Sequence, residues 1–355
     1  MAIPKFPAAK HSFHVELKKR INDYFEGSGK SFTGNKQLYI KAVILFTAFV
    51  GLYSHLVFFT PSTLWSVLEC VLLGLVVAGI GFNIMHDGAH GSFSKYKWVN
   101  NLAAFTLNLL GGSSFMWNVK HNVIHHAFTN IDGVDDDIDI QPWMRMSSTQ
   151  PKLKIHKYQH FYFWFLYSML YILWVFVLDY QKYFKKKIGE MPLKRMTRWD
   201  HIVFWGFKLL YLILFFIVPF YTVGFIPTLI GFLIFSVVAG FILSIVFQLA
   251  HTVEHTHFPV PHDNSGKLED EWAIHQLKTT ANFAPKNKLI SWLVGGLNYQ
   301  IEHHLFPKIS HVHYPAIRKI IKQACNEFNI PYTEYRKMSH AVISHVLFLK
   351  QMGNA

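Results

Sequence analysis

Residues 64–85 read LWSVLECVLLGLVVAGIGFNIM, and the motif HDGAH follows directly at residues 86–90. A run of about 20 mostly apolar residues is long enough for a helix to cross a bilayer. This stretch therefore predicts a membrane-spanning helix that ends in two histidines. Three more runs of this kind follow the same reasoning, so the sequence predicts an all-α polytopic membrane protein with four transmembrane helices, at about 42–59, 64–85, 202–222 and 225–247.

The composition supports a membrane protein. Of 355 residues, 51% are hydrophobic and only 15% are charged, which excludes a disordered chain and most nucleic-acid-binding proteins. We therefore expect membrane lipid and no nucleic acid as a partner. Lys and Arg outnumber Asp and Glu by 34 to 21, an excess that is typical of the cytoplasmic face of a membrane protein. The two cysteines, Cys70 and Cys325, allow at most one disulfide, and we expect a reducing compartment.

The distribution of positive charge predicts the topology. The short turns at 60–63 and 223–227 carry no charge, whereas residues 1–36, the loop at 181–198 and the region after 247 are basic. The positive-inside rule then places both turns outside, and both termini and all histidine motifs on the cytoplasmic side.

This topology holds only if the aromatic run at 161–178 lies in the interface instead of crossing the membrane. A second interfacial helix is expected at 98–117, where asparagines interrupt the apolar residues. The predicted organisation is thus a basic N-terminal arm at 1–36, a membrane domain at 37–335 with a cytosolic helical cap, and a C-terminal tail at 336–355. Within the arm, which has no features of a signal peptide, an amphipathic helix at about 12–26 is expected to lie on the headgroups.

Four histidine clusters follow the predicted helices on one side of the membrane. Residues three or four positions apart share a helical face, so each cluster can direct two or three ligands to one point. Eight imidazoles and one amide are too many for a single tetrahedral zinc ion, and they suit two metals of higher coordination. Imidazole ligands permit iron, zinc, copper or nickel. The predicted ligands are His86, His90, His121, His125, His126, His251, Gln300, His303 and His304.

Carboxylates beside these ligands are predicted to accept imidazole N–H bonds and to fix the ring orientation. Asp87, Glu254, His255 and Glu302 are the candidates for this supporting role. His255 is also a second candidate for the position of His251, since both are expected on one helical face, and whether it binds metal stays open. The acidic run at 135–139 is either a further set of such partners or a solvated loop.

The motifs HDGAH (86–90), HNVIHH (121–126) and NYQIEHHLFP (298–307) resemble the three histidine boxes of membrane-bound fatty acid desaturases. Gln300, where many relatives carry histidine, resembles the front-end group that includes the linoleoyl-CoA (Δ6-type) desaturases. The resemblance spans residues 60–335. It implies an oxidoreductase in which two non-haem irons, bound by the box histidines and by His251, use O2 to place a cis double bond in an acyl chain.

The 355 residues contain no His-Pro-Gly-Gly haem signature, so we expect a separate electron donor such as ferredoxin or cytochrome b5 with its reductase. The acyl carrier (CoA, phospholipid or carrier protein), the chain length and the double-bond position stay open. A hydroxylase or ketolase of the same superfamily is the alternative function. A zinc hydrolase lacks support because no His-Glu-x-x-His occurs, and transport histidines would lie within the spans instead of beside them.

Overall fold

The protein is described here from a computed structural model, which places residues 3–7, 12–262 and 265–355. Part of the predicted basic arm, residues 1–2 and 8–11, lies outside these ranges. The α-helices are α1 (Phe13–Ser28), α2 (Lys36–Ser54), α3 (Thr63–Ile80), α4 (His86–Ala89), α5 (Lys97–Leu109), α6 (Ser114–Trp117), α7 (His126–Phe128), α8 (Gln159–Leu173), α9 (Asp179–Lys185), α10 (Arg198–Leu212), α11 (Val218–Thr222), α12 (Phe225–His251), α13 (Trp272–Thr279), α14 (Lys288–Leu293), α15 (Gln300–Leu305), α16 (Tyr314–Glu327) and α17 (Met338–Asn354).

Wider and tighter helical turns join several of these helices into longer ones. The π-helical turns are η1 (His55–Phe59), η2 (Gly81–Met85), η3 (Asn118–His125), η5 (Trp174–Leu178) and η6 (Ile213–Ile217), and the 3-10 turns are η4 (Lys154–Tyr158) and η8 (His311–His313). The strands are two residues long: β1 (Lys187–Ile188) pairs antiparallel with β2 (Met191–Pro192), and β3 (Asn282–Phe283) pairs parallel with β4 (Glu334–Tyr335). The described chain is therefore mainly helical, as predicted.

Five continuous helices are long and apolar enough to cross a membrane, which is typical of an integral membrane protein. They are Lys36–Phe59, Thr63–Ala89, Lys154–Lys185, Arg198–Thr222 and Phe225–His251. The four predicted spans lie inside four of them. The additional helix contains the run at 161–178, so length and composition alone do not give the predicted count of four. The second predicted interfacial segment, 98–117, is two helices, α5 and α6, because the chain turns at Gly111 with φ +88°.

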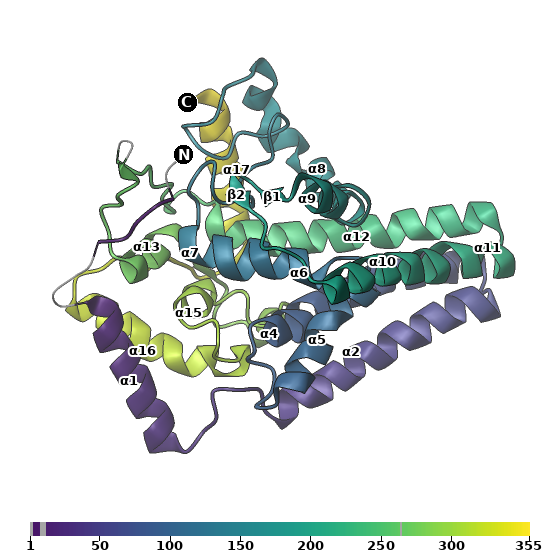
Figure 1. The fold of residues 1–355 in the computed structure, drawn as a ribbon, viewed down its shortest axis with the longest axis horizontal. Helices are drawn as coiled ribbons and strands as arrows, with labels where there is room; N and C mark the ends of the chain where they lie inside the picture. Colours follow the sequence, from purple (N-terminus) through teal and green to yellow (C-terminus); the bar gives the residue numbers. More distant parts are fainter. Residues whose placement is uncertain (1–2, 8–11, 263–264) are drawn as a thin grey trace.

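Glycines let α12 approach its neighbours closely. A Cβ atom on Gly74 of α3 would lie 2.6 Å from the Phe235 carbonyl oxygen, and one on Gly240 of α12 would lie 2.5 Å from that of Ser168 on α8. Side chains larger than hydrogen would therefore separate these helices. Figure 1 shows α2, α10 and α12 running along the long axis of the molecule, with α13, α15 and α16 gathered at one end.

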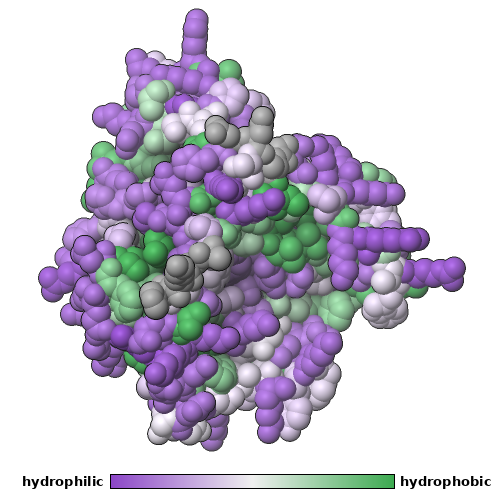
Figure 2. Space-filling model, turned by 60° about the vertical axis from the view of Figure 1, so that its left-hand side comes forward, coloured by the Kyte–Doolittle hydropathy of each residue, from purple (hydrophilic) through white to green (hydrophobic). Residues whose placement is uncertain are grey.

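That end of the molecule is the polar one. Figure 2 brings it forward and shows a mostly hydrophilic surface with a smaller hydrophobic area. The predicted N-terminal helix is confirmed as α1, but its apolar face contacts protein instead of headgroups. Phe13, Leu17, Ile21 and Phe25 form one buried cluster with residues of α16, including Ile321.

The C-terminal residues differ from the expected tail because α17 is part of the core. Phe348 and Leu349 are buried in the same cluster as Leu249 of α12. The His345 ring lies between Tyr167 of α8 (Nε2 to OH, 2.9 Å) and the Thr252 carbonyl oxygen, which lies 2.7 Å from its Nδ1. Helix α17 therefore supports the segment that directly follows His251.

Replacing a buried leucine of α17 tests this packing. Leu349→Ala should lower the free energy of unfolding by about 2–5 kcal/mol, because it removes buried methyl groups and leaves a cavity. Thermal unfolding in detergent measures the change. Leu347→Ala is the matched control, since Leu347 is 44% exposed on the same helix and should have little effect. Equal unfolding temperatures for the two variants would contradict a packed α17.

Candidate metal centre

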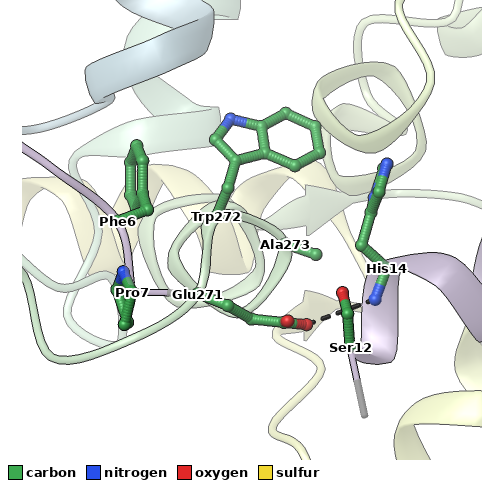
Figure 3. A pocket seen from close by; sticks show the side chains of 7 residues that line it. All are labelled: Phe6, Pro7, Ser12, His14, Glu271, Trp272 and Ala273. Carbon is green, nitrogen blue, oxygen red and sulfur yellow. Dashed lines mark hydrogen bonds between the residues drawn. The ribbon is translucent and has the colours of Figure 1, made fainter. Parts of the chain in front are cut away.

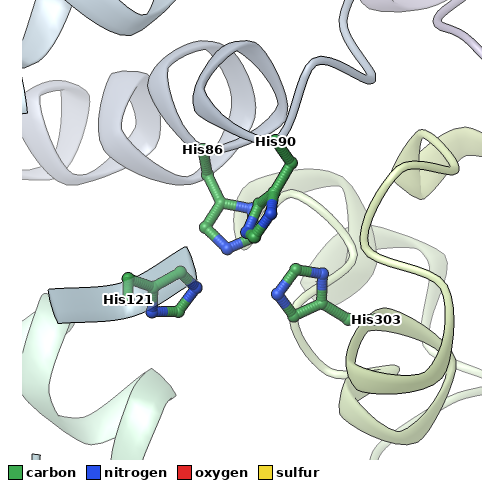
Figure 4. A group of neighbouring side chains, drawn as sticks. All are labelled: His86, His90, His121 and His303. Carbon is green, nitrogen blue, oxygen red and sulfur yellow. The ribbon is translucent and has the colours of Figure 1, made fainter. Parts of the chain in front are cut away.

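The first histidine box continues the helix of α3 through the π turn η2 into α4. His86 begins α4 and His90 follows its last residue, and their ring centroids are 4.6 Å apart. His121 of η3 and His303 of α15 complete a group in which one ring nitrogen from each histidine lies within 4.8 Å of the others. Figure 4 shows the four rings directed toward a common centre from three separate segments.

The second box is wound as a π-helix, which changes which of its residues face together. In this wider turn, hydrogen bonds span five residues instead of four. His121 and His126 are five positions apart, yet their Nε2 atoms are 3.2 Å apart, while the His121 and His125 rings are also stacked at 5.2 Å. All three histidines of the box therefore face the same region, which a regular α-helix would not allow.

A second group forms at the end of α12. His125, His251 and His304 bring one ligand nitrogen each within 4.8 Å of one another, and His126 forms a third such group with His303 and His304. His126 thus lies between the first two groups. The Gln300 Nε2 atom is 2.9 Å from Nε2 of His251. The structure therefore brings together all nine residues that the sequence predicts as metal ligands.

Most ligand atoms of these groups are buried and lack a protein partner, which is what a metal site requires. Within the groups and Gln300, the buried atoms without a hydrogen-bond partner are Nε2 of His86, His90, His125, His303 and His304, Nδ1 of His126 and Oε1 of Gln300. His121 Nε2 contacts His126, and His251 Nε2 contacts Gln300. Unpaired buried polar atoms are costly and uncommon in native proteins. Their convergence on two adjacent points fits two metal ions.

The opposite nitrogen of several rings is held by a fixed acceptor. His125 Nδ1 lies 3.0 Å from a carboxylate oxygen of Asp135, His304 Nδ1 lies 2.7 Å from Gln276 Oε1, and His303 Nδ1 lies 3.0 Å from the Tyr314 hydroxyl. With carboxylate or amide oxygens as acceptors, Nδ1 carries the proton and Nε2 presents its lone pair to a metal. The sequence pattern did not indicate Gln276 or Tyr314, because neither lies in a histidine box.

Burial keeps most of these imidazoles neutral. It lowers the pKa of His121, His126, His303 and His304 well below the usual value, and the neighbouring histidines lower it further. A neutral imidazole is the form that binds a metal. Burial also acts to lower the pKa of His125, but the carboxylates of Asp135 and Asp137 together raise it above the usual value.

The predicted supporting residues lie in different places. Asp87 is buried but accepts hydrogen bonds from Ser310 Oγ (2.7 Å) and His311 Nδ1 (3.0 Å), not from a box histidine. Glu302 accepts hydrogen bonds from Tyr332 Oη (2.6 Å) and Asn282 Nδ2 (2.8 Å), and burial raises its pKa to about 7. Both carboxylates therefore join the boxes to the surrounding chain.

Glu254 and His255 lie outside the histidine groups. Both are exposed, and the His255 ring stacks on Tyr335 at a centroid distance of 6.4 Å. The expectation that His251 and His255 share a helical face is wrong, because α12 ends at His251.

A cavity of about 760 Å³ borders the first histidine group and is lined by α3, α8, α9 and α12. His86, His121 and Gln300 line it beside apolar side chains such as Phe82 and Leu243. Its charged part adjoins His121: Lys120 Nζ lies 2.6 Å from Asp137, and Lys182 Nζ lies 2.8 Å from Asp136. An apolar chain with a polar end would match this lining.

A smaller cavity of about 360 Å³ lies at the polar end of the molecule between the N-terminal segment and α13 (Figure 3). Trp272 lines it and donates an indole hydrogen bond to the His126 carbonyl oxygen at 3.1 Å. His14 and Glu271 are its titratable side chains, too few for a metal centre like that of the histidine groups.

Removing the acceptor behind His304 tests the metal centre. Gln276→Leu takes away the oxygen that holds His304 Nδ1, so it should weaken binding of ferrous iron about 10–100-fold. Competition with a chelator measures the affinity of the purified protein. Gln323→Leu is the control, since Gln323 is exposed on α16. Equal affinity for iron in the two variants would contradict the role of Gln276.

Known proteins with similar sequences identify the family. The model of the family described as fatty acid desaturase matches residues 62–336. The chain is 39% identical over 344 residues to the sn-1 linoleoyl-lipid 6-desaturase of Arthrospira platensis, covering 96% of this chain and 92% of that protein. It is 36% identical to the protein of that name from Synechocystis sp. (98% and 97% covered), and 35% identical to the acyl-lipid (8-3)-desaturase of Physcomitrium patens (98% and 72%). The chain belongs to the fatty acid desaturase family.

Proposed function

We propose that this fatty acyl desaturase places a cis double bond in an acyl chain of a membrane lipid, using two non-haem iron ions and O2. The observation that carries the proposal is the pair of buried histidine groups, with unpaired ligand atoms, at the wall of a largely apolar cavity. The nine predicted ligands would hold the irons. His86, His90, His121 and His303 would surround one and His125, His251 and His304 the other, with His126 between the two groups and Gln300 beside His251.

In the balanced reaction, O2, two electrons, two protons and two hydrogen atoms from neighbouring methylenes give two waters and one double bond. Bound iron would supply the activation of O2 that an unactivated methylene pair requires. The chain itself contributes the positioning. Asp135, Gln276 and Tyr314 hold the ligand rings, and apolar side chains such as Phe82 and Leu243 exclude water from the cavity.

The acyl carrier we propose is a membrane lipid. Two relatives that resemble the chain over more than nine-tenths of both lengths are named as desaturases of linoleoyl-lipid, and a third is named for acyl-lipid. The lysines of the cavity do not distinguish a lipid from CoA. Lys120 and Lys182 are paired with Asp136 and Asp137, whereas Lys185 and Lys187 line the same cavity and are exposed.

We further propose that four of the five apolar helices cross the membrane and that the one formed by η4, α8, η5 and α9 lies in its cytoplasmic interface. Contacts at its two ends support this. Gln159 at its start donates to the Arg145 carbonyl oxygen, and Lys182 near its end pairs with Asp136, in the segment after the second box. Beyond α9, Ile188 packs with Ile124.

This arrangement places both termini and the metal centre on the cytoplasmic side, where the basic segments are expected. Electrons would come from a separate donor such as ferredoxin or cytochrome b5. Of the basic groups expected on this side, Lys185, Lys186, Lys187, Lys308 and Lys319 are exposed, whereas Arg318 and Lys322 pair with Glu334. The exposed lysines are the candidate surface for an acidic donor.

The product identifies the reaction. A host that expresses the protein should form acyl chains two mass units lighter than their precursors, because desaturation removes two hydrogens; lipid mass spectrometry measures this change. His303→Ala should abolish it together with iron binding, whereas His340→Ala, an exposed histidine of α17, should leave both unchanged. Products that gain oxygen would instead indicate the hydroxylase or ketolase alternative.

The four-crossing arrangement has its own test. A reporter fused at residue 190, just beyond α9, should give a cytoplasmic signal, because the helix before it does not carry the chain across the bilayer. A reporter at residue 223, between α11 and α12, should give an external signal and is the matched control. An external signal at residue 190 would overturn the arrangement.

A further inference from the structure

The cavity continues away from the metal centre and ends at a layer of close-packed side chains. Val77 and His86 both line it and are nine residues apart on the same continuous helix, which corresponds to about 13 Å along the helix axis. At the Val77 end the lining also includes Leu110, Tyr171 and Val175, which belong with Val77 to one buried cluster. The part beside His121 contains Lys120, Asp136 and Asp137, whereas the Val77 end is lined by apolar side chains and by Asp179, which pairs with Lys208.

Tyr171 is fixed within this layer. Its hydroxyl donates to the Leu110 carbonyl oxygen at 2.7 Å and lies 3.2 Å from the Tyr211 hydroxyl. Its side chain is 3% exposed, and its ring packs edge-on against Phe235 at a centroid distance of 5.9 Å. Buried hydrogen bonds of this kind keep a phenol in one orientation.

A buried lysine supports the layer from behind. Lys208 Nζ donates to the carbonyl oxygens of Gly111 (2.7 Å) and Val175 (2.9 Å) and pairs with Asp179 at 2.9 Å. It therefore ties the turn after Leu110 to the π turn after Tyr171. A Cβ atom on Gly111 would lie 2.8 Å from the Tyr211 ring, so no free space remains at this turn.

We propose that Tyr171 is the stop for the methyl end of the acyl chain and thereby sets the longest chain that the enzyme accepts. The inference rests on the proposed function. Each further methylene that finds apolar space gains about 0.8 kcal/mol, whereas a methylene pressed against a fixed, close-packed wall gains nothing and strains the wall. The polar end of the substrate lies near the metals, so the stop selects chain length without setting the position of the double bond.

Tyr171→Ala removes the stop. The full-length Tyr171→Ala enzyme is tested in membranes that contain lipids of mixed acyl length. It should convert longer chains more efficiently than the wild type does, relative to the chains that the wild type prefers. The expected increase is about fourfold for each added methylene, the ratio that corresponds to about 0.8 kcal/mol. Mass spectrometry of the products measures the length profile, and the double-bond position counted from the carbonyl should not change.

Matched variants distinguish the loss of the stop from a general loss of packing around the helix. Tyr171→Phe keeps the ring and should keep the wild-type profile. Phe163→Ala should keep it as well, because Phe163 is a buried residue of the same helix that does not line the cavity. Val77→Leu fills the same end and should shift the preference to shorter chains, which decides the question if Tyr171→Ala does not fold.

An active Tyr171→Ala enzyme with the wild-type profile would overturn the proposal, as would an equal shift in Phe163→Ala. If Tyr171→Ala does not fold, an unchanged profile in Val77→Leu would overturn it. A wild-type enzyme that forms no desaturated product on any lipid would refute the proposed function itself. An active enzyme whose length preference does not depend on Tyr171 would refute only the role of Tyr171.

Discussion

The structure depends on holding eight imidazoles together in a buried interior, with a ring nitrogen of six of them unpaired. Each such nitrogen costs free energy while it lacks a partner, and neighbouring rings repel one another once protonated. The cost is acceptable only because other contacts fix the rings: Asp135 behind His125, Gln276 behind His304 and Tyr314 behind His303. A bound metal ion would be the missing partner of these nitrogens.

The same requirement explains how the distant parts of the chain are arranged. The first box ends one membrane helix and His251 ends another, so both deliver ligands at the point where the chain leaves the apolar region. The third box lies on the short helix α15, whose position depends on contacts with the surrounding polar part of the chain. Helices α1 and α16 bury apolar faces in one cluster with α13 and α15 at this end, whereas α17 packs in the cluster of α3, α8 and α12.

The sequence pattern indicated the histidines that the structure brings together, because their spacing is local, and it failed where the geometry was set by contacts between distant segments. It treated the second box as a regular helix, whereas the π turn η3 adds His126 to the face of His121. It extended α12 to His255, although the helix ends at His251. Gln276 has no motif of its own, and its role follows only from the position of α13 beside α15.

By itself, the sequence determined the membrane class, the helical fold and the nine ligand candidates, because long apolar runs and repeated i, i+3 and i+4 histidines act through local geometry. Only the tertiary structure decided which histidines share a group, which side chains hold them, where the cavity ends and that the C-terminal residues form a core helix. These features depend on contacts between segments far apart in the chain, and such contacts leave no periodic pattern in a single sequence.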